Sequence, residues 1–127
     1  MAERGVDAYR KIDIKARVES ATPGQLVVLL FEGLLTSLVE ARAAILEKDY
    51  QAKGQKISKA LSIVLTLQES LNGDVESDLP YRIERLYDYM QRRLLEVNQS
   101  MDVAIIDEVV ELVVTLKSGW DQIADPR

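Results

Sequence analysis

The sequence of 127 residues contains no cysteine and no histidine. Without cysteine there can be no disulfide and no thiolate metal site, and without histidine there can be no imidazole ligand. Catalytic arrangements that pair a serine or a cysteine with a histidine are excluded for the same reason. Most common enzyme chemistries are therefore ruled out, and the lack of cysteine suits a reducing compartment.

Long apolar runs are also absent. No run approaches the roughly 18 residues that a membrane-spanning helix requires. The opening stretch MAERGVDAYRKIDIK lacks the apolar segment of a secretory signal. We therefore expect a cytoplasmic protein that does not insert into a membrane.

Basic residues are outnumbered, and the net charge is −5. This charge disfavours nucleic acid as a partner, because binding phosphates requires a basic surface. Lys53, Lys56 and Lys59 are nevertheless clustered, whereas residues 101–127 carry six acidic side chains. Three interpretations stay open: the two segments attract each other as neighbours in the fold, they steer a partner, or they are two solvated faces.

Proline and glycine are scarce, with three and six occurrences, and apolar residues recur with a helical period between them. Gly73 and Pro126 are expected to end the second and the fourth of four long helices. The expected helices span about residues 22–48, 50–72 and 78–99, and the fourth starts at Ser100 or Asp102 and ends by residue 125.

Capping residues stand at three of the expected helix starts. Thr22 and Gln25 have the spacing of a capping box, and Pro23 fits the first turn because it lacks only a donor that would be unpaired there. Asp49 and Asp78 are expected to cap the second and the third helix. Short connections between long helices predict an all-α, antiparallel up-down four-helix bundle. We expect a single domain over residues 1–127, with an N-terminal arm at 1–21 and the bundle at 22–125.

The apolar faces of these helices differ in width. On the third helix the apolar residues fall within an arc of roughly 100°, the width of a helix that faces one core. This projection points Tyr87 inward and places Tyr89 on a polar flank beside arginines. The apolar arcs of the other three helices are about twice as wide, which exceeds what a four-helix monomer requires. A generous core, a homodimer interface or cover by the arm would each account for the surplus.

Paired carboxylates are the remaining candidates for catalysis or metal binding. Glu108 and Glu111, or Glu32 and Glu40, have helical spacing, but a bundle that holds two metal ions also needs histidines on its inner faces. The first pair falls on the polar arc of its helix and is expected to be solvated. With no glycine-rich nucleotide loop in the sequence, we expect neither catalysis nor a cofactor or metal.

Five ordered stretches resemble a known family: AYRKIDIKARVESATPGQL, LLFEGLL, ISKALSIVLTL, LYDYMQRRLLEVN and LKSGW. Together they cover roughly residues 5–123 and resemble the flagellin export chaperone family, FliS. The resemblance implies a cytosolic helical bundle that binds the disordered C-terminal segment of flagellin, prevents premature polymerisation and assists delivery to a component of the type III export gate. It also implies that the arm around Tyr9 covers part of the binding surface and moves when the client binds.

The apolar surplus and the resemblance together predict a binding surface for an amphipathic client helix. The residues that we expect to contact the partner are Tyr9, Ile12, Ile57, Leu61, Val64, Leu65, Ile106, Val110 and Val113. The alternative is a homodimeric bundle that has no flagellin client, in which a second copy covers the wide apolar arcs.

Overall fold

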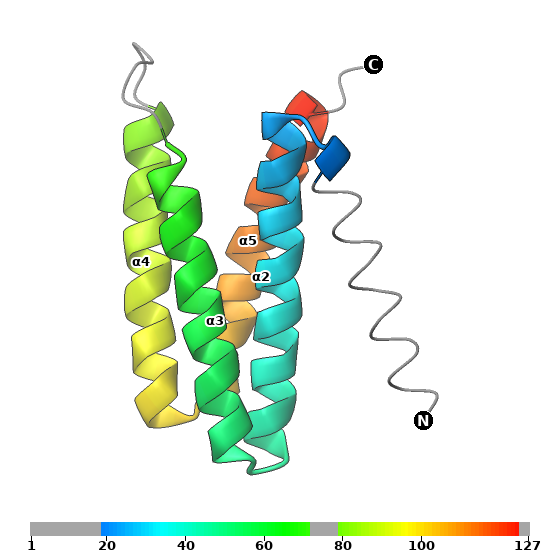
Figure 1. Cartoon of the computed structure of the whole chain (residues 1–127). Coiled ribbons are helices and arrows are strands. Elements are labelled where there is room, and N and C mark those ends of the chain that lie inside the picture. The colour runs from blue at the N-terminus through cyan, green and yellow to red at the C-terminus, as the bar shows by residue number, and fades with distance from the viewer. Residues whose placement is uncertain (1–18, 72–78, 125–127) are drawn as a thin grey trace, which may run out of the picture.

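The computed structural model describes residues 19–71 and 79–124. Four long helices account for nearly all of this part, and it contains no strand. Their bounds are α2 Pro23–Leu46, α3 Tyr50–Glu69, α4 Leu79–Ser100 and α5 Val103–Ala124 (Figure 1). The all-α prediction is confirmed. The expected arm falls almost wholly on residues 1–18, outside the described residues, so the division into arm and bundle stays a prediction.

The starts of α2 and α3 are as the sequence predicts. Gln25 N donates to Thr22 Oγ1 at 3.2 Å, and Thr22 N donates to Gln25 Oε1 at 2.9 Å, which completes the capping box. Asp49 caps α3 by accepting a hydrogen bond from Ala52 N at 3.2 Å. The helix α3 ends at Glu69, before the predicted residue 72. The expected signals at Gly73, Asp78 and Pro126 lie outside the described residues.

Two connections contain a residue that sequence reasoning missed. Lys48 has φ 60° and Met101 has φ 59°, which is the left-handed region where glycine is usual. The N–H of Lys48 donates to the carbonyl of Ile45 at 3.1 Å. The N–H of Asp49 donates to the carbonyl of Ala44 at 2.8 Å, which completes a Schellman motif at the end of α2.

The helices form a ring in which each one packs against two others (Figure 1). The helix α2 packs against α3 and α5, and α4 packs against the same two from the other side. Successive helices run in opposite directions, so the up-down bundle is confirmed. The buried cluster between them includes Tyr87, which is 1% exposed and points inward as predicted. The cluster comprises Phe31, Leu34, Leu38, Ala41, Ile45, Ile57, Ala60, Val64, Leu67, Ile83, Tyr87, Met90, Leu94, Val97, Ile105, Ile106, Val109 and Val113.

The lysines of α3 do not face the acidic segment that follows Ser100. Lys56 pairs with Glu40 of α2 at 2.6 Å, because α3 lies beside α2 and α4. Lys53 is only 7% exposed, and its Nζ lies 3.0 Å from the carbonyl oxygen and 2.9 Å from Oδ1 of Asn98. Its ammonium therefore caps the last turn of α4, where unpaired carbonyls favour a cation. The prediction of attraction between these two segments as neighbours is wrong.

Candidate docking face between helices α2 and α5

The helices α2 and α5 lie side by side, and their ion pair shows which residues stand opposite one another (Figure 1). Arg42 Nε lies 2.9 Å from Asp107 Oδ1, and further along the same pair of helices Leu35 and Val114 line a common pocket. From the first pair to the second, the chain moves back seven residues on α2 and forward seven residues on α5, about two helix turns on each, as in an antiparallel contact. This register also places Val39 opposite Val110.

Apolar side chains follow the outer side of this contact. Val39 is 59% exposed, Leu46 is 61% exposed and Val114 is 50% exposed, while Leu35 and Val110 are partly buried. We name the surface of these five residues the α2–α5 face. On α2 its members are spaced four and seven residues apart, which keeps them on one side of the helix. The α2–α5 face is therefore an apolar strip at the edge of the two arcs whose inner parts form the core, and the Arg42–Asp107 ion pair interrupts it between Val39 and Leu46.

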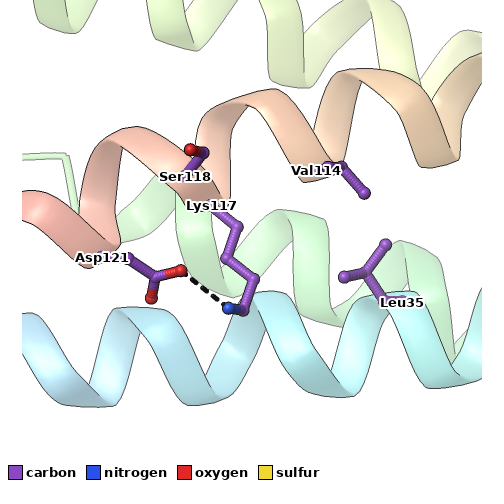
Figure 2. A pocket seen from close by; sticks show the side chains of 5 residues that line it. All are labelled: Leu35, Val114, Lys117, Ser118 and Asp121. Atoms are coloured by element: carbon purple, nitrogen blue, oxygen red, sulfur yellow. Dashed lines mark hydrogen bonds and ion pairs between the residues drawn. The ribbon is translucent and has the colours of Figure 1, made fainter.

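A shallow pocket of about 280 Å³ lies within this face. Leu35 points into it from α2 and Val114 points into it from α5, so that its floor is apolar (Figure 2). Lys117, Ser118 and Asp121 form a polar rim, and Lys117 Nζ is held 2.8 Å from Asp121 Oδ2. An apolar floor with a polar rim suits an aliphatic or aromatic side chain carried by a partner.

The border of the face carries more negative than positive charge. Glu47 and Glu111 are exposed beside it, and within the described residues neither of the two carboxylates has a hydrogen bond or an ion pair. Asp107 and Asp121 are already paired with Arg42 and Lys117. A partner helix with basic residues beside its apolar stripe would complement this border.

The structure divides the predicted binding residues into three groups. Tyr9 and Ile12 lie outside the described residues. Four lie in the core with at most 1% of their surface exposed, and in this conformation they cannot contact a partner: Ile57, Val64, Ile106 and Val113. The remaining three reach the surface: Leu61 and Val110 are partly buried, and Leu65 is 47% exposed.

These three surface residues are not brought together. Val110 belongs to the α2–α5 face, whereas Leu61 and Leu65 lie on the side of α3 that faces α4. The helical projection of the sequence placed Val39 and Leu46 in the apolar arc of their helix but did not select them as binding residues. The available signal was their position at the edge of that arc, because edge positions are the ones that neighbouring helices leave uncovered.

The other contact of α5, with α4, carries polar side chains. Tyr89 Oη donates to Glu108 Oε1 at 2.9 Å, and Arg93 Nε donates to the same oxygen at 2.8 Å. Arg93 also pairs with Glu96 at 2.6 Å. Tyr89 lies on a polar flank as predicted, and the Glu108 side chain is 40% exposed, so it is solvated as predicted and in addition paired with Arg93 and Tyr89.

This network shifts the titration of its members. Hydrogen bonds from Arg93 and then Tyr89 lower the pKa of Glu108 below its ordinary value. The hydrogen bond to Glu108 raises the pKa of the Tyr89 hydroxyl and that of the Arg93 guanidinium. The charged form of the carboxylate is therefore the one that holds α4 against α5.

The described residues hold no group of three or more acidic side chains that could bind a metal ion. Within residues 19–71 and 79–124, no helix is both long enough and apolar enough to cross a bilayer. What the geometry does offer is an apolar face with a side-chain pocket on a rigid bundle. These features define a helical protein that binds a partner through surface complementarity.

Comparison with known proteins identifies the family. The family profile described as "Flagellar protein FliS" matches residues 5–127. The flagellar secretion chaperone FliSB of Pseudomonas aeruginosa is 38% identical over 123 residues, covering 97% of this chain and 98% of its own. The flagellar secretion chaperone FliS of Salmonella typhimurium is 36% identical and covers 94% of this chain and 90% of its own.

A solved structure described as a flagellar chaperone from bacteria has the same fold. It superposes with a TM-score of 0.75 over 94% of this chain and 96% of its own, at 18% identity. The chain belongs to the FliS family of flagellar secretion chaperones. It is accordingly a chaperone of flagellar export.

Proposed function

We propose that this chaperone works in the bacterial cytoplasm and binds the C-terminal segment of flagellin as an amphipathic helix on the α2–α5 face. The observation that carries the proposal is the exposed strip from Leu46 to Val114 with its side-chain pocket. A helix laid along it would place successive anchors at i, i+4 and i+7, which is how amphipathic helices dock in grooves.

The length of the α2–α5 face suits a client helix about as long as α5. The helix α5 has 22 residues, which corresponds to about 33 Å at 1.5 Å per residue. A client helix of similar length would cover Val39 and Leu46, whose exposure leaves apolar area in water. Ordering a disordered client opposes binding by about 2 to 5 kcal/mol, so the apolar contacts must exceed that amount.

No chemical step is part of this mechanism. The chaperone would sequester the client by binding energy alone, which prevents premature polymerisation of flagellin. Release would follow when a component of the export gate takes the client. The acidic border beside Glu47 and Glu111 favours client segments with basic residues next to their apolar stripe.

The proposal is tested by calorimetric titration of the full chain with a peptide of the flagellin C-terminus. Val39→Asp and Val114→Asp place a charge on the α2–α5 face, and each is expected to weaken binding at least 10-fold. Leu95→Asp is the matched control, because Leu95 is 57% exposed and Val39 is 59% exposed. Leu95 lies on α4, away from this face, so its variant should bind as the wild type does.

Circular dichroism establishes that each variant is folded. Wild-type affinity in folded Val39→Asp and Val114→Asp would refute the proposed site. Flagellin that lacks its C-terminal segment should not bind at all, and binding by this truncated client would refute the proposed ligand. A client-free homodimer, the alternative function, predicts no heat of binding with either form.

The arm is a second part of the proposal. Following the resemblance, we propose that Tyr9 and Ile12 cover part of the client-binding surface until flagellin displaces them. A variant without residues 1–18 should then remain helical, bind more of an apolar dye and bind the client with altered affinity. Unchanged dye binding together with unchanged client affinity would argue against a role for the arm.

A further inference from the structure

The helices α4 and α5 lie close together where one passes into the other, and they diverge toward the opposite end of the bundle (Figure 1). Near the close end, Glu108 of α5 accepts hydrogen bonds from Tyr89 and Arg93 of α4. Gly119 follows Glu108 by eleven residues, about three helix turns, so it lies on the same side of α5. A Cβ at Gly119 would nevertheless meet no neighbouring atom of the described residues within 4 Å. The surface between the two helices is therefore open at the end where α4 begins and α5 ends.

Three arginines follow the side of α4 that borders this opening. Arg82, Arg85, Tyr89 and Arg92 are separated by three, four and three residues, which places them on one side of the helix. Since Tyr89 binds Glu108, this side is the one next to α5. All three arginines are exposed. We name the surface of Arg82, Arg85 and Arg92 the arginine face.

Two of these arginines have no acidic partner in the described part of the chain. The side chains of Arg82 and Arg92 make no hydrogen bond or ion pair there. Because α4 and α5 are antiparallel and Tyr89 lies level with Glu108, the stretch of α5 level with Arg82 is about residues 112–119. That stretch, LVVTLKSG, contains no acidic residue. The helix α5 therefore neutralises Arg93 further along but offers Arg82 no carboxylate.

The arginine face differs in charge from the protein that carries it. The chain has a net charge of −5, and the α2–α5 face has an acidic border. A local basic surface on such a molecule attracts an anionic group. A guanidinium binds a carboxylate through two parallel hydrogen bonds, which makes arginine well suited to recognise one. Arg82 and Arg92 are ten residues apart, about 15 Å along the helix, so the matching partner presents carboxylates over about three helix turns.

We propose that the arginine face docks an acidic amphipathic helix of a partner protein, which lies along the opening between α4 and α5 with carboxylates on Arg82 and Arg92. Leu86 and Leu112, each one turn along from Arg82 and Glu108, are partly buried and give the opening an apolar floor. An anionic bilayer suits this molecule less well, because the net charge of −5 repels it. The inference does not depend on flagellin being the client, because the α2–α5 face lies on the other side of α5.

Fluorescence anisotropy of a labelled synthetic peptide with the full chain measures the docking. The probe is a helical peptide of alanine, leucine and glutamate, with glutamates at i, i+3, i+7 and i+10 to match the arginine face. The control peptide has the same composition, but its glutamates are distributed around the helix. The chain is expected to bind the probe at least about 10-fold more tightly than the control. Equal binding of the two peptides, or binding of neither up to about 1 mM, overturns the proposal.

Charge reversal tests the arginines individually. Arg82→Glu and Arg92→Glu should each weaken probe binding at least about 10-fold, because each variant replaces an attraction by a repulsion. Lys59→Glu is the matched control, because Lys59 is exposed on α3, has no ion pair within the described residues and undergoes the same change of charge. It should bind the probe as the wild type does. Equal weakening by all three variants would mean that only the overall charge matters, which overturns the site.

Gly119→Leu tests the opening beside α5. The new side chain occupies the space into which the partner helix would dock, so probe binding should fall at least about 10-fold. Gly54→Leu on α3 is the control, because a Cβ there also meets no neighbouring atom of the described residues within 4 Å. Circular dichroism establishes that both variants are folded. Wild-type binding by folded Gly119→Leu overturns the placement of the partner along α5.

Two further measurements separate this inference from its alternatives. Vesicles of phosphatidylserine and phosphatidylcholine should bind the wild type no better than Arg82→Glu. Vesicle binding that Arg82→Glu abolishes would assign the arginine face to a membrane and overturn the proposal. Val39→Asp, which tests the client site, should leave probe binding unchanged, so the proposed function and this inference can fail independently.

Discussion

At the residue scale, two lysines in the described part of the chain have roles that their charge does not suggest. Lys53 is buried and caps the end of α4 through Asn98. Lys48 occupies the left-handed position that completes the end of α2. A lysine is usually a solvated charge, so neither role could be inferred from residue type. Both depend on where the backbone of a neighbouring turn or helix lies.

Replacing Lys48 by glycine should stabilise the protein. The left-handed conformation at φ 60° costs a side-chain-bearing residue about 1 kcal/mol, and glycine adopts it without that strain. We expect Lys48→Gly to raise the melting temperature by about 4 °C, measured by circular dichroism. The control is Glu47→Gly, because Glu47 has φ −86° and its replacement should lower stability. A lower melting temperature for Lys48→Gly would show that the position is not strained.

At the element scale, the helices differ in what holds them to their neighbours. The contact between α4 and α5 relies on the hydrogen bonds of Glu108 with Tyr89 and Arg93. The contact between α2 and α5 has one ion pair, Arg42–Asp107, and otherwise consists of apolar side chains, some of which remain exposed. The polar groups between α4 and α5 bind each other, whereas the exposed apolar side chains along α2 and α5 remain available to a partner.

Acid should weaken the contact between α4 and α5. Hydrogen bonds from Arg93 and Tyr89 hold the folded-state pKa of Glu108 below its ordinary value of 4.5. A group with a depressed folded pKa stabilises the fold above its unfolded pKa and loses that contribution as the pH falls through the folded pKa. The free energy of unfolding of the wild type, taken relative to that of Glu108→Gln, should therefore be constant above about pH 5 and decline below about pH 4.5.

Urea unfolding measures the free energy of unfolding of the wild type and of Glu108→Gln between about pH 3 and 7. The difference between the two should begin to fall at about pH 4.5. Glu111→Gln is the control, because the carboxylate of the exposed Glu111 on the same helix has no hydrogen bond or ion pair within the described residues. It should follow the wild type throughout. A difference between wild type and Glu108→Gln that does not change with pH would contradict the role of the ionised carboxylate.

At the scale of the whole molecule, one cluster of buried side chains joins all four helices and carries the stability. The exposed apolar faces lie outside this cluster. Residues adjacent in sequence can therefore differ completely in role: Leu38 is 0% exposed and Val39 is 59% exposed.

Truncation of this adjacent pair should separate folding from binding. Leu38→Ala leaves a cavity in the core and should lower the free energy of unfolding by about 3 kcal/mol. Val39→Ala should change it by less than about 0.5 kcal/mol, because the side chain is already in water. Chemical denaturation checks both values. Similar losses in the two variants would mean that the α2–α5 face is part of the core.

The sequence by itself determined the helices, the N-terminal caps of α2 and α3, and the inward face of α4. Capping at Thr22 and Asp49 is local chemistry, and the inward position of Tyr87 follows from a single narrow apolar arc. The family could also be inferred, because it rests on ordered motifs along the chain.

Only the tertiary structure decided which part of each wide apolar arc is core and which part is surface. Ile57 and Leu65 belong to the same arc of α3, yet the first is 1% exposed and the second is 47% exposed. The arc gives the direction of apolar residues around one helix axis but contains no information on how far the neighbouring helices cover it. That coverage depends on how four helices pack against each other, so the faces open to a partner appear only in the assembled bundle.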